Sequence, residues 1–300
     1  MSKLIDTYGR EHRNLRVSLT DRCSLRCTYC MPNDFAAWIP NGDLLTTNEL
    51  LTIIEVAVEQ GINEVRLTGG EPLLRPDIVE IVDRIAGLAN APRLTLTTNG
   101  LKLKELALPL AKAGLNRINV SLDTLSRERF KKLTYRDRFD DVIEGLHAAK
   151  AAGLFPIKVN TVLLQGINDD EAPALLAWAI ENEYSLRFIE QMPLDAGGIW
   201  DRATMVSADQ IYADLSRHYE LTPVDGRGSS PAEEFYINGT QATVGIIGSV
   251  TRPFCGACDR LRLTSDGQLR SCLFSNEEVD VRKVLRDESK DDSAKRLEIA

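Results

Sequence analysis

The sequence predicts an α/β fold in which a parallel sheet is covered by helices on its outside. Short apolar or β-branched runs alternate with segments of helical periodicity over the first two thirds of the chain. Polar or glycine-rich residues follow directly after most of these runs. The pattern leaves an open sheet and a barrel as alternatives, and in both the carboxyl ends of the strands gather functional residues on one rim.

The predicted strands are short runs, as expected for buried strands of a parallel sheet. In chain order they are Leu15–Leu19, Glu64–Leu67, Leu94–Thr97, Arg117–Ser121, Ile157–Leu163 and Leu186–Glu190.

The predicted helices lie between these strands. The first has a capping-box signal, Thr46 followed by Glu49, and Gly61, Gly114 and Gly153 end three of the helices. The predicted helices are Thr47–Glu59, Pro76–Leu88, Leu103–Ala113, Phe139–Ala152 and Asp170–Asn182.

The alternation changes after Ser207. One more amphipathic helix, a turn-rich stretch and two strand-like pieces follow, and Asn238-Gly239 between the pieces is typical of a hairpin turn. We therefore divide the chain into a core of residues 1–219 and a smaller C-terminal unit of residues 220–300 packed on it. The elements after Ser207 are Ala208–Tyr219, the turns of 225–231, Glu234–Ile237 and Ala242–Ile247.

Composition indicates a globular protein, with 43% apolar and 27% charged residues. The net charge of −8 argues against nucleic-acid binding through bulk electrostatics, and an anionic small molecule would need a local cluster of arginines. We see no signal sequence and no apolar run long enough to span a membrane, so we expect a cytoplasmic protein without membrane association.

All cysteines of the chain fall into two groups of three. Three thiolates can bind three irons of a cubic iron–sulfur cluster and leave the fourth iron open for a small molecule. A structural zinc site would normally want four protein ligands, and disulfides are the alternative for a secreted chain. The groups are Cys23, Cys27 and Cys30, and Cys255, Cys258 and Cys272.

A Gly69-Gly70-Glu71-Pro72 turn follows the second predicted strand. Taken alone it fits an ordinary strand-ending turn, although glycine also lets a strand edge approach a ligand closely. The other polar strand tips are Thr97-Thr98-Asn99-Gly100, Ser121-Leu122-Asp123 and Met192-Pro193.

The CxxxCxYC motif and the GGEP motif together resemble the radical S-adenosylmethionine (SAM) superfamily. The CGACDRLRL segment, Cys272 and the RFIEQMPL segment at 187–194 are similar to the GTP 3′,8-cyclases of molybdenum cofactor biosynthesis, and the resemblance covers about residues 10–285. Two alternatives stay open: a radical SAM enzyme that acts on a peptide or another metabolite, and a non-catalytic or truncated iron–sulfur homologue.

The resemblance implies a partial (β/α)6 barrel of the TIM type with a smaller C-terminal iron–sulfur region. It also implies a radical SAM lyase that converts GTP to (8S)-3′,8-cyclo-7,8-dihydroguanosine 5′-triphosphate. In that family one 4Fe–4S cluster cleaves SAM to a 5′-deoxyadenosyl radical, which takes hydrogen from the ribose C3′ of GTP, and a second 4Fe–4S cluster holds the guanine.

Carried over by position, the resemblance assigns the two cysteine groups to the two clusters. Arginine suits phosphate oxygens, and two arginines separated by one residue in an extended segment point the same way, although any one arginine alone fits a solvated surface charge. The implied SAM-binding residues are Tyr29, Gly70, Ser121 and Met192, and the implied GTP-binding residues are Arg16, Arg66, Thr97, Lys158, Arg260, Leu261 and Arg262.

The implied partners are a reductant and cyclic pyranopterin monophosphate synthase, which would take the product, and a homodimer is left open. The family also has a Gly-Gly tail that reaches the active site, whereas residues 1–300 end in Glu-Ile-Ala without it. We expect both clusters to bind without that tail, and turnover to depend on it.

Overall fold

The computed structural model describes residues 3–31, 37–195, 197–198 and 200–300. Within them, the strands join one sheet in the order β12-β11-β10-β1-β2-β3-β4-β5-β6-β9-β8-β7. The strands are β1 Asn14–Ser18, β2 Glu64–Thr68, β3 Arg93–Thr98, β4 Arg117–Ser121, β5 Ile157–Val162, β6 Ser185–Ile189, β7 Leu221–Pro223, β8 Glu233–Ile237, β9 Thr243–Ile247, β10 Arg260–Leu263, β11 Gln268–Arg270 and β12 Val279–Asp280.

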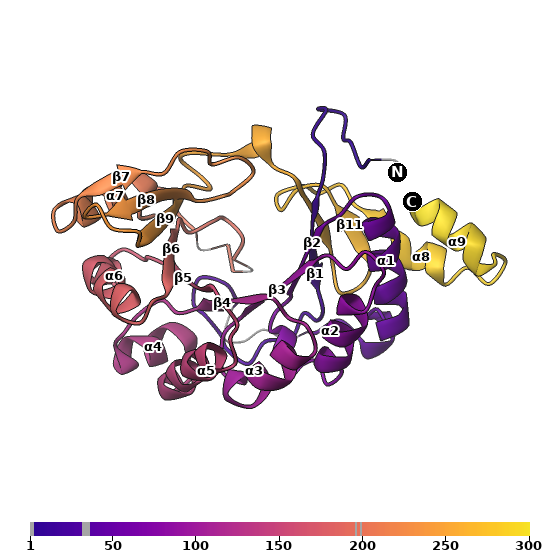
Figure 1. Cartoon of the computed structure of the whole chain (residues 1–300), viewed down its shortest axis with the longest axis horizontal. Coiled ribbons are helices and arrows are strands. Elements are labelled where there is room, and N and C mark those ends of the chain that lie inside the picture. The colour runs from indigo at the N-terminus through magenta and orange to yellow at the C-terminus, as the bar shows by residue number, and fades with distance from the viewer. Residues whose placement is uncertain (1–2, 32–36, 196, 199) are drawn as a thin grey trace.

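Strands β1 to β6 are parallel and follow one another in sequence order. Figure 1 shows them as a curved sheet with the helices along its outer side. The partial (β/α)6 barrel expected from the family resemblance is confirmed by this topology. The helices are α1 Thr47–Glu59, α2 Ile78–Ala86, α3 Leu103–Lys112, α4 Arg127–Thr134, α5 Phe139–Ala151, α6 Ala172–Glu181, α7 Ala208–Ser216, α8 Val281–Leu285 and α9 Asp292–Ile299.

The predicted elements lie within a few residues of the observed ones, and helix α1 has the predicted bounds. Its capping box is present, because the Glu49 amide donates to Thr46 Oγ1 and the Thr46 amide donates to Glu49 Oε2. Helix α4 was not predicted. It is strongly polar and buries few apolar side chains, chiefly Phe130 and Leu133, so its periodicity is weak.

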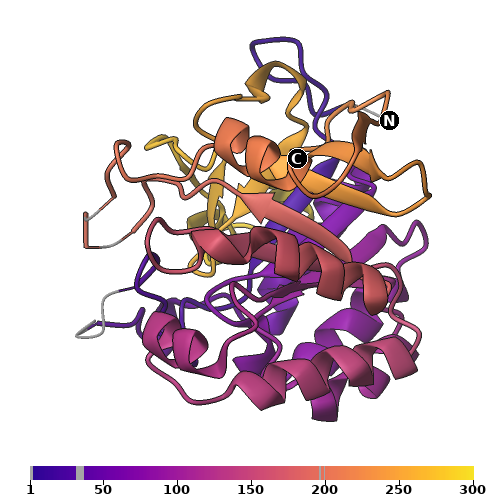
Figure 2. The ribbon, with the colours of Figure 1, turned by 90° about the vertical axis from the view of Figure 1, so that its left-hand side faces the viewer.

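Residues 220–300 add strands to both edges of the parallel sheet. Strand β9 pairs in parallel with β6 and forms the predicted hairpin with β8, in which Asn238 and Gly239 have φ of 50° and 66°. Strand β10 pairs in parallel with β1 and leads into β11 and β12. Strands β7, β10, β11 and β12 were not among the predicted strands. Figure 2 shows the two additions from the side. The division at residue 219 stays a prediction.

The apolar core lies between the sheet and its outer helices. In β2, for example, Val65 and Leu67 are fully buried beneath the helices, whereas Arg66 between them lines the inside of the curved sheet. Since successive side chains of a strand alternate between its faces, the sequence of each strand sets both surfaces at once. None of the described helices is long and apolar enough to cross a membrane.

Candidate functional site

The first cysteine loop follows β1 and is held against the Gly69-Gly70 turn at the end of β2. The Gly70 amide donates to Thr20 O at 2.7 Å, and the Glu71 amide donates to Arg22 O at 2.7 Å. A Cβ at Gly70 would lie 2.3 Å from Arg22 O, so only glycine allows this backbone approach. The turn therefore sets the position of the loop that presents the cysteines.

Glu71 joins the tip of β2 to the tip of β3. Its side chain is buried and accepts hydrogen bonds from the Thr98 hydroxyl at 2.6 Å and the Asn99 amide at 2.7 Å. Burial raises the pKa of this carboxyl above its ordinary value. The Asn99 side chain in turn donates to Ser24 Oγ at 3.0 Å and lies 3.8 Å from Cys23 Sγ. The polar tips therefore converge on the first cysteine loop.

Tyr29, between two of these cysteines, is fixed by the tip of β4. Its hydroxyl donates to Asp123 Oδ2 at 2.7 Å, and burial raises the pKa of Asp123 to about 6. Burial and the negative charges of Asp123, Cys30 and Cys23 raise the pKa of the Cys27 thiol well above its ordinary value. The thiols of this group are free. Cys23 and Cys27 are partly buried, whereas Cys30 is exposed, and the three are close enough to interact electrostatically.

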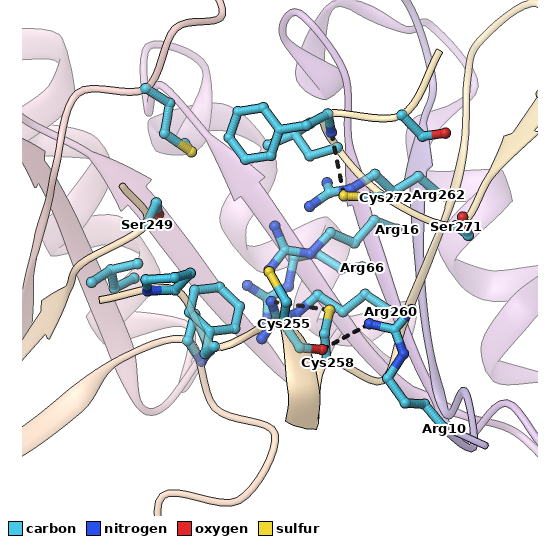
Figure 3. A pocket seen from close by; sticks show the side chains of 18 of the residues that line it. Arg10, Arg16, Arg66, Ser249, Cys255, Cys258, Arg260, Arg262, Ser271 and Cys272 are labelled. Atoms are coloured by element: carbon cyan, nitrogen blue, oxygen red, sulfur yellow. Dashed lines mark hydrogen bonds between the residues drawn. The ribbon is translucent and has the colours of Figure 1, made fainter. Parts of the chain in front are cut away.

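The second cysteine group lies on the wall of a cavity of about 820 Å³. Cys255 and Cys258 come from the short turn before β10, and Cys272 follows β11, which pairs with β10. Figure 3 shows the three sulfur atoms around the labelled arginines. Arg260 Nη1 lies 3.9 Å from Cys258 Sγ, and the Phe274 amide lies 3.5 Å from Cys272 Sγ.

A row of arginines crosses the floor of this cavity. The register places Arg262 beside Arg16, and Arg16 beside Arg66, on neighbouring strands β10, β1 and β2. Burial, together with the adjacent Arg66 and Arg262, lowers the pKa of Arg16 well below its ordinary value. Among the described residues, the buried Nε atoms of Arg16, Arg66 and Arg187 have no hydrogen-bond partner. Such a cluster favours a multiply charged anion.

A second cavity of about 350 Å³ lies beyond the arginines. Arg16, Arg66 and Arg260 line both cavities, while Lys158 lines the smaller one. Burial and the nearby charge of Arg187 lower the pKa of Lys158 to about 7. Cationic side chains thus continue from the second cysteine group into the smaller cavity.

The structure brings most predicted GTP-contacting side chains to the two cavities. Leu261 is the exception, because it packs against the apolar core while its neighbours Arg260 and Arg262 both point into the larger cavity, as predicted. Thr97 and Met192 also line the larger cavity. Tyr29, Gly70 and Ser121 lie outside the lining of both cavities. Tyr29 belongs to the first cysteine loop, and Gly70 and Ser121 lie at the tips of β2 and β4.

Sequence reasoning missed several residues that line the cavities. Asn119, Asn160 and Arg187 are inward-facing polar residues of β4, β5 and β6. Buried apolar residues flank Asn119 and Arg187, and the buried Val159 and Thr161 flank Asn160. This alternation could have predicted the cavity-lining residues. A strand covered by helices on one side carries polar residues on its inner face only where that face lines a polar site. Arg10 and Phe254 also line the larger cavity, but they lie outside the strands, so no alternation in the sequence predicted them.

The two cysteine groups fit iron–sulfur clusters better than single metal ions. In the described part of the chain, no three His, Cys, Asp or Glu side chains are close enough to hold one metal ion. Thiolates that bind separate irons of a cluster lie further apart than the ligands of one ion. Each cysteine group supplies three free thiols, as a cluster with one open iron requires.

Two family descriptions together match most of the chain: "Radical SAM superfamily" residues 17–179, and "Molybdenum Cofactor Synthesis C" residues 184–299. The GTP 3′,8-cyclase of Streptomyces coelicolor is 57% identical over 297 residues, which are 98% of this chain and 87% of the relative. The GTP 3′,8-cyclase of Mycolicibacterium smegmatis is 53% identical over 289 residues, 94% of this chain and 80% of the relative.

Solved structures share the fold at low sequence identity. SuiB of Streptococcus suis bound to S-adenosylmethionine superposes with a TM-score of 0.68 at 17% identity, covering 92% of this chain and 65% of SuiB. Tagged anSMEcpe with bound AdoMet gives 0.61 at 13% identity, covering 95% of this chain and 79% of that one.

Proposed function

Since the chain belongs to the radical SAM superfamily and, within it, to the GTP 3′,8-cyclases, we propose that its two cysteine groups and the arginines beside the second one carry out that reaction. The enzyme converts GTP to (8S)-3′,8-cyclo-7,8-dihydroguanosine 5′-triphosphate, the first step of molybdenum cofactor biosynthesis. Its cofactors are two 4Fe–4S clusters and SAM.

The first cysteine group is assigned to the SAM-binding cluster. Its three free thiols and the glycine turn that orders their loop suit a cluster with one open iron. When bound, this cluster and SAM supply the one-electron chemistry that removes hydrogen from the substrate ribose. The chain positions SAM and excludes water around it. The SAM contacts are assigned to Tyr29, Gly70, Ser121 and Met192.

The second cysteine group is assigned to the cluster that holds the guanine of GTP. The observation that carries this proposal is that Cys255, Cys258 and Cys272 share one cavity with several buried arginines. A nucleotide bound there would place its base toward the thiols and its phosphates toward the cations. Desolvated guanidinium groups bind phosphate oxygens strongly, because no water competes with them.

The triphosphate is assigned to the cationic floor that joins the two cavities. Thr97 would contact the ribose side of the nucleotide, and Leu261 would contact it through the main chain, since its side chain packs in the core. The charges of the floor act together, so no single arginine accounts for binding. The assigned cations are Arg16, Arg66, Lys158, Arg260 and Arg262.

Anaerobic turnover tests the proposal. The chain is reconstituted with iron and sulfide and then incubated with SAM, a reductant and GTP. We expect 5′-deoxyadenosine and the cyclised nucleotide in equal amounts. If 5′-deoxyadenosine forms while GTP stays intact, the substrate assignment is wrong. If both clusters assemble and SAM is not cleaved, the chain is a binding protein and not an enzyme.

We also propose where the reaction stands in the cell. The enzyme would act in the cytoplasm with a separate electron donor, and its product would pass to cyclic pyranopterin monophosphate synthase. The supporting observation is chemical, because the cyclised nucleotide still carries the triphosphate and its five-membered guanine ring must be rearranged before a pterin forms. Detection of cyclic pyranopterin monophosphate when both enzymes are combined with GTP checks this order.

A further inference from the structure

The segment before β1 folds back on itself beside the second cysteine group. Ile5 and Glu11 form an antiparallel bridge, and the His12 amide donates to Leu4 O at 2.8 Å. Figure 1 shows this segment as the indigo loop that extends beyond β1. Asp6, Tyr8 and Arg10 of this hairpin line the larger cavity. The N-terminal hairpin, residues 4–12, is therefore part of the wall that holds the second triad.

Arg10 connects this hairpin to the cysteine turn. Its Nη1 donates to Cys255 O at 2.7 Å, as Figure 3 shows. The Nε and Nη2 atoms of Arg10 both contact Oδ2 of Asp6, at 2.7 and 2.6 Å. Asp6 therefore fixes the opposite edge of the guanidinium. The Arg10 and Tyr8 amides donate to the other oxygen of Asp6, so the carboxylate is itself held in place.

The charge of Arg10 also acts on the thiols. Asp6 raises the pKa of Arg10, and the negative charges of Cys258 and Cys255 contribute to the same shift. Arg10, Cys255 and Cys258 also line the same cavity, so the charged guanidinium lies beside the residues that would hold the second cluster. Its donors are committed to Asp6 and to Cys255, which leaves little of the planar group for a phosphate.

The cysteine turn is also held at its other end. The amides of Arg13 and Asn14 donate to Asp259 O at 3.0 and 3.1 Å, directly before β10. Two main-chain contacts therefore fix Asp259, whereas a side chain fixes Cys255. A side-chain contact can be removed by substitution without altering the backbone, so the role of Arg10 can be tested separately.

We propose that Arg10, held by Asp6, is a positioning residue for the second cluster. It fixes the carbonyl of Cys255, and so the direction of that thiolate, and it places a positive charge beside the cluster. Groups that support metal ligands in this way change affinity by about 10- to 100-fold when they are removed, and nearby charge sets the reduction potential of iron–sulfur clusters. The inference rests on the proposed function, since it requires a cluster on Cys255, Cys258 and Cys272.

The test follows the second cluster by itself. The full chain with Cys23→Ser, Cys27→Ser and Cys30→Ser is reconstituted, and the rate of iron release to a chelator and the reduction potential are measured. In this background Arg10→Gln should release iron about tenfold faster and should shift the potential to more negative values, because the reduced cluster loses a neighbouring cation.

Two further variants separate geometry from charge. Arg10→Lys keeps the charge but loses the planar fork, so iron release should accelerate while the potential stays near that of the parent. Lys3→Gln is the matched control: it removes an equal charge from the residue directly before the hairpin, where Lys3 pairs with Glu11 at 3.1 Å. It should change neither measurement.

The outcomes distinguish this inference from the proposed function. If the parent chain assembles no cluster on the second triad, the proposed function fails. If the parent assembles it, and Arg10→Gln matches the parent in both release rate and potential, the positioning role is wrong. If Arg10→Gln does not fold, as judged by loss of the first cluster in the six-cysteine chain, Arg10→Lys decides: release at the parent rate would overturn the inference.

Discussion

At the scale of single residues, the cations that surround the two cavities differ in what binds them. Arg262 faces the larger cavity, and burial together with the nearby Arg260 lowers its pKa to about 10. Arg260 also donates to Ser229 O at 2.8 Å and stacks over the Phe254 ring at 5.0 Å. Arg260 additionally lies 3.9 Å from the Cys258 thiol. Arg260 and Arg262 look equivalent in the sequence, but Arg260 makes additional contacts to Ser229, Phe254 and the Cys258 thiol.

This difference leads to a first prediction. Arg262→Ala should weaken GTP binding by about 10- to 100-fold, the effect of losing a charged hydrogen bond, and leave iron content unchanged. Arg260→Ala should weaken GTP binding similarly and also lower the occupancy of the second cluster. Calorimetry with GTP and iron analysis measure both effects. Equal iron content in the two variants would contradict the separate role of Arg260.

Lys158 leads to a second prediction, on pH. Its pKa of about 7 in the free protein is lowered by burial and by Arg187, so much of it is neutral at pH 8. A bound polyphosphate favours the charged form and raises this pKa, so binding takes up a proton. Affinity should fall by up to about tenfold per pH unit as pH rises above 7, and stay level below it.

Calorimetry at pH 8 in two buffers of different ionisation heat measures that proton. We expect the observed binding heats to differ for the parent chain and to coincide more closely for Lys158→Met. Identical heats for the parent in both buffers would show that Lys158 does not titrate on binding.

At the scale of elements, the strand tips hold the first cysteine loop by backbone contact. A Cβ at Gly70 would lie 2.3 and 2.4 Å from the carbonyl oxygens of Arg22 and Asp21. Backbone atoms cannot move aside as a flexible side chain can, so the β2 tip and the cysteine loop would have to separate. The GGEP motif, predicted here as a ligand-binding turn, therefore also allows the end of β2 to pack closely against the backbone of the first cysteine loop.

A third prediction follows for this turn. Gly70→Ala should greatly reduce the first cluster and SAM binding while the second cluster stays intact. Gly42→Ala is the control, because a Cβ there meets no atom within 4 Å. Iron content and SAM binding of the two variants check the prediction, and a fully loaded first cluster in Gly70→Ala would refute it.

The elements predicted from the sequence were those with strong periodicity. Helix α1 was placed at its observed bounds because its cap and its apolar stripe agree. Helix α4 was missed because it is too polar for a periodic signal, and strand β11 because it has only three residues, Gln268–Arg270. A local sequence pattern reports only on one turn or one strand. Helix α4 and strand β11 are instead stabilised mainly by the elements that pack against them.

At the scale of the whole molecule, the cavity inside the barrel is lined by cationic side chains, although the chain as a whole has a net charge of −8. The inner faces of β1, β2 and β6 place Arg16, Arg66 and Arg187 on the wall of one cavity, and Glu64 pairs with Arg66 at 3.0 Å. In the described part of the chain, several buried guanidinium nitrogens have no hydrogen-bond partner, which destabilises the fold. An anion that binds them should therefore stabilise the whole fold.

A fourth prediction tests this stabilisation. Inorganic triphosphate at about 100 times its Kd adds about 2.7 kcal/mol, which should raise Tm by roughly 5 °C. Arg66→Gln should lose most of that shift, whereas Arg84→Gln, an exposed arginine on α2, should keep it. Differential scanning calorimetry measures the shifts. An equal rise with sulfate at the same ionic strength would show a general salt effect instead of a site.

The sequence by itself determined the two cysteine triads, the alternation of strands and helices, and the strand tips near the first triad, because each depends on spacing within a short segment. Only the tertiary structure decided that Arg10 reaches Cys255, a residue 245 positions away, and that Arg187 lines the same cavity as Arg16. Those contacts depend on β10 pairing with β1 and on the curvature of the sheet, which no local window of sequence specifies.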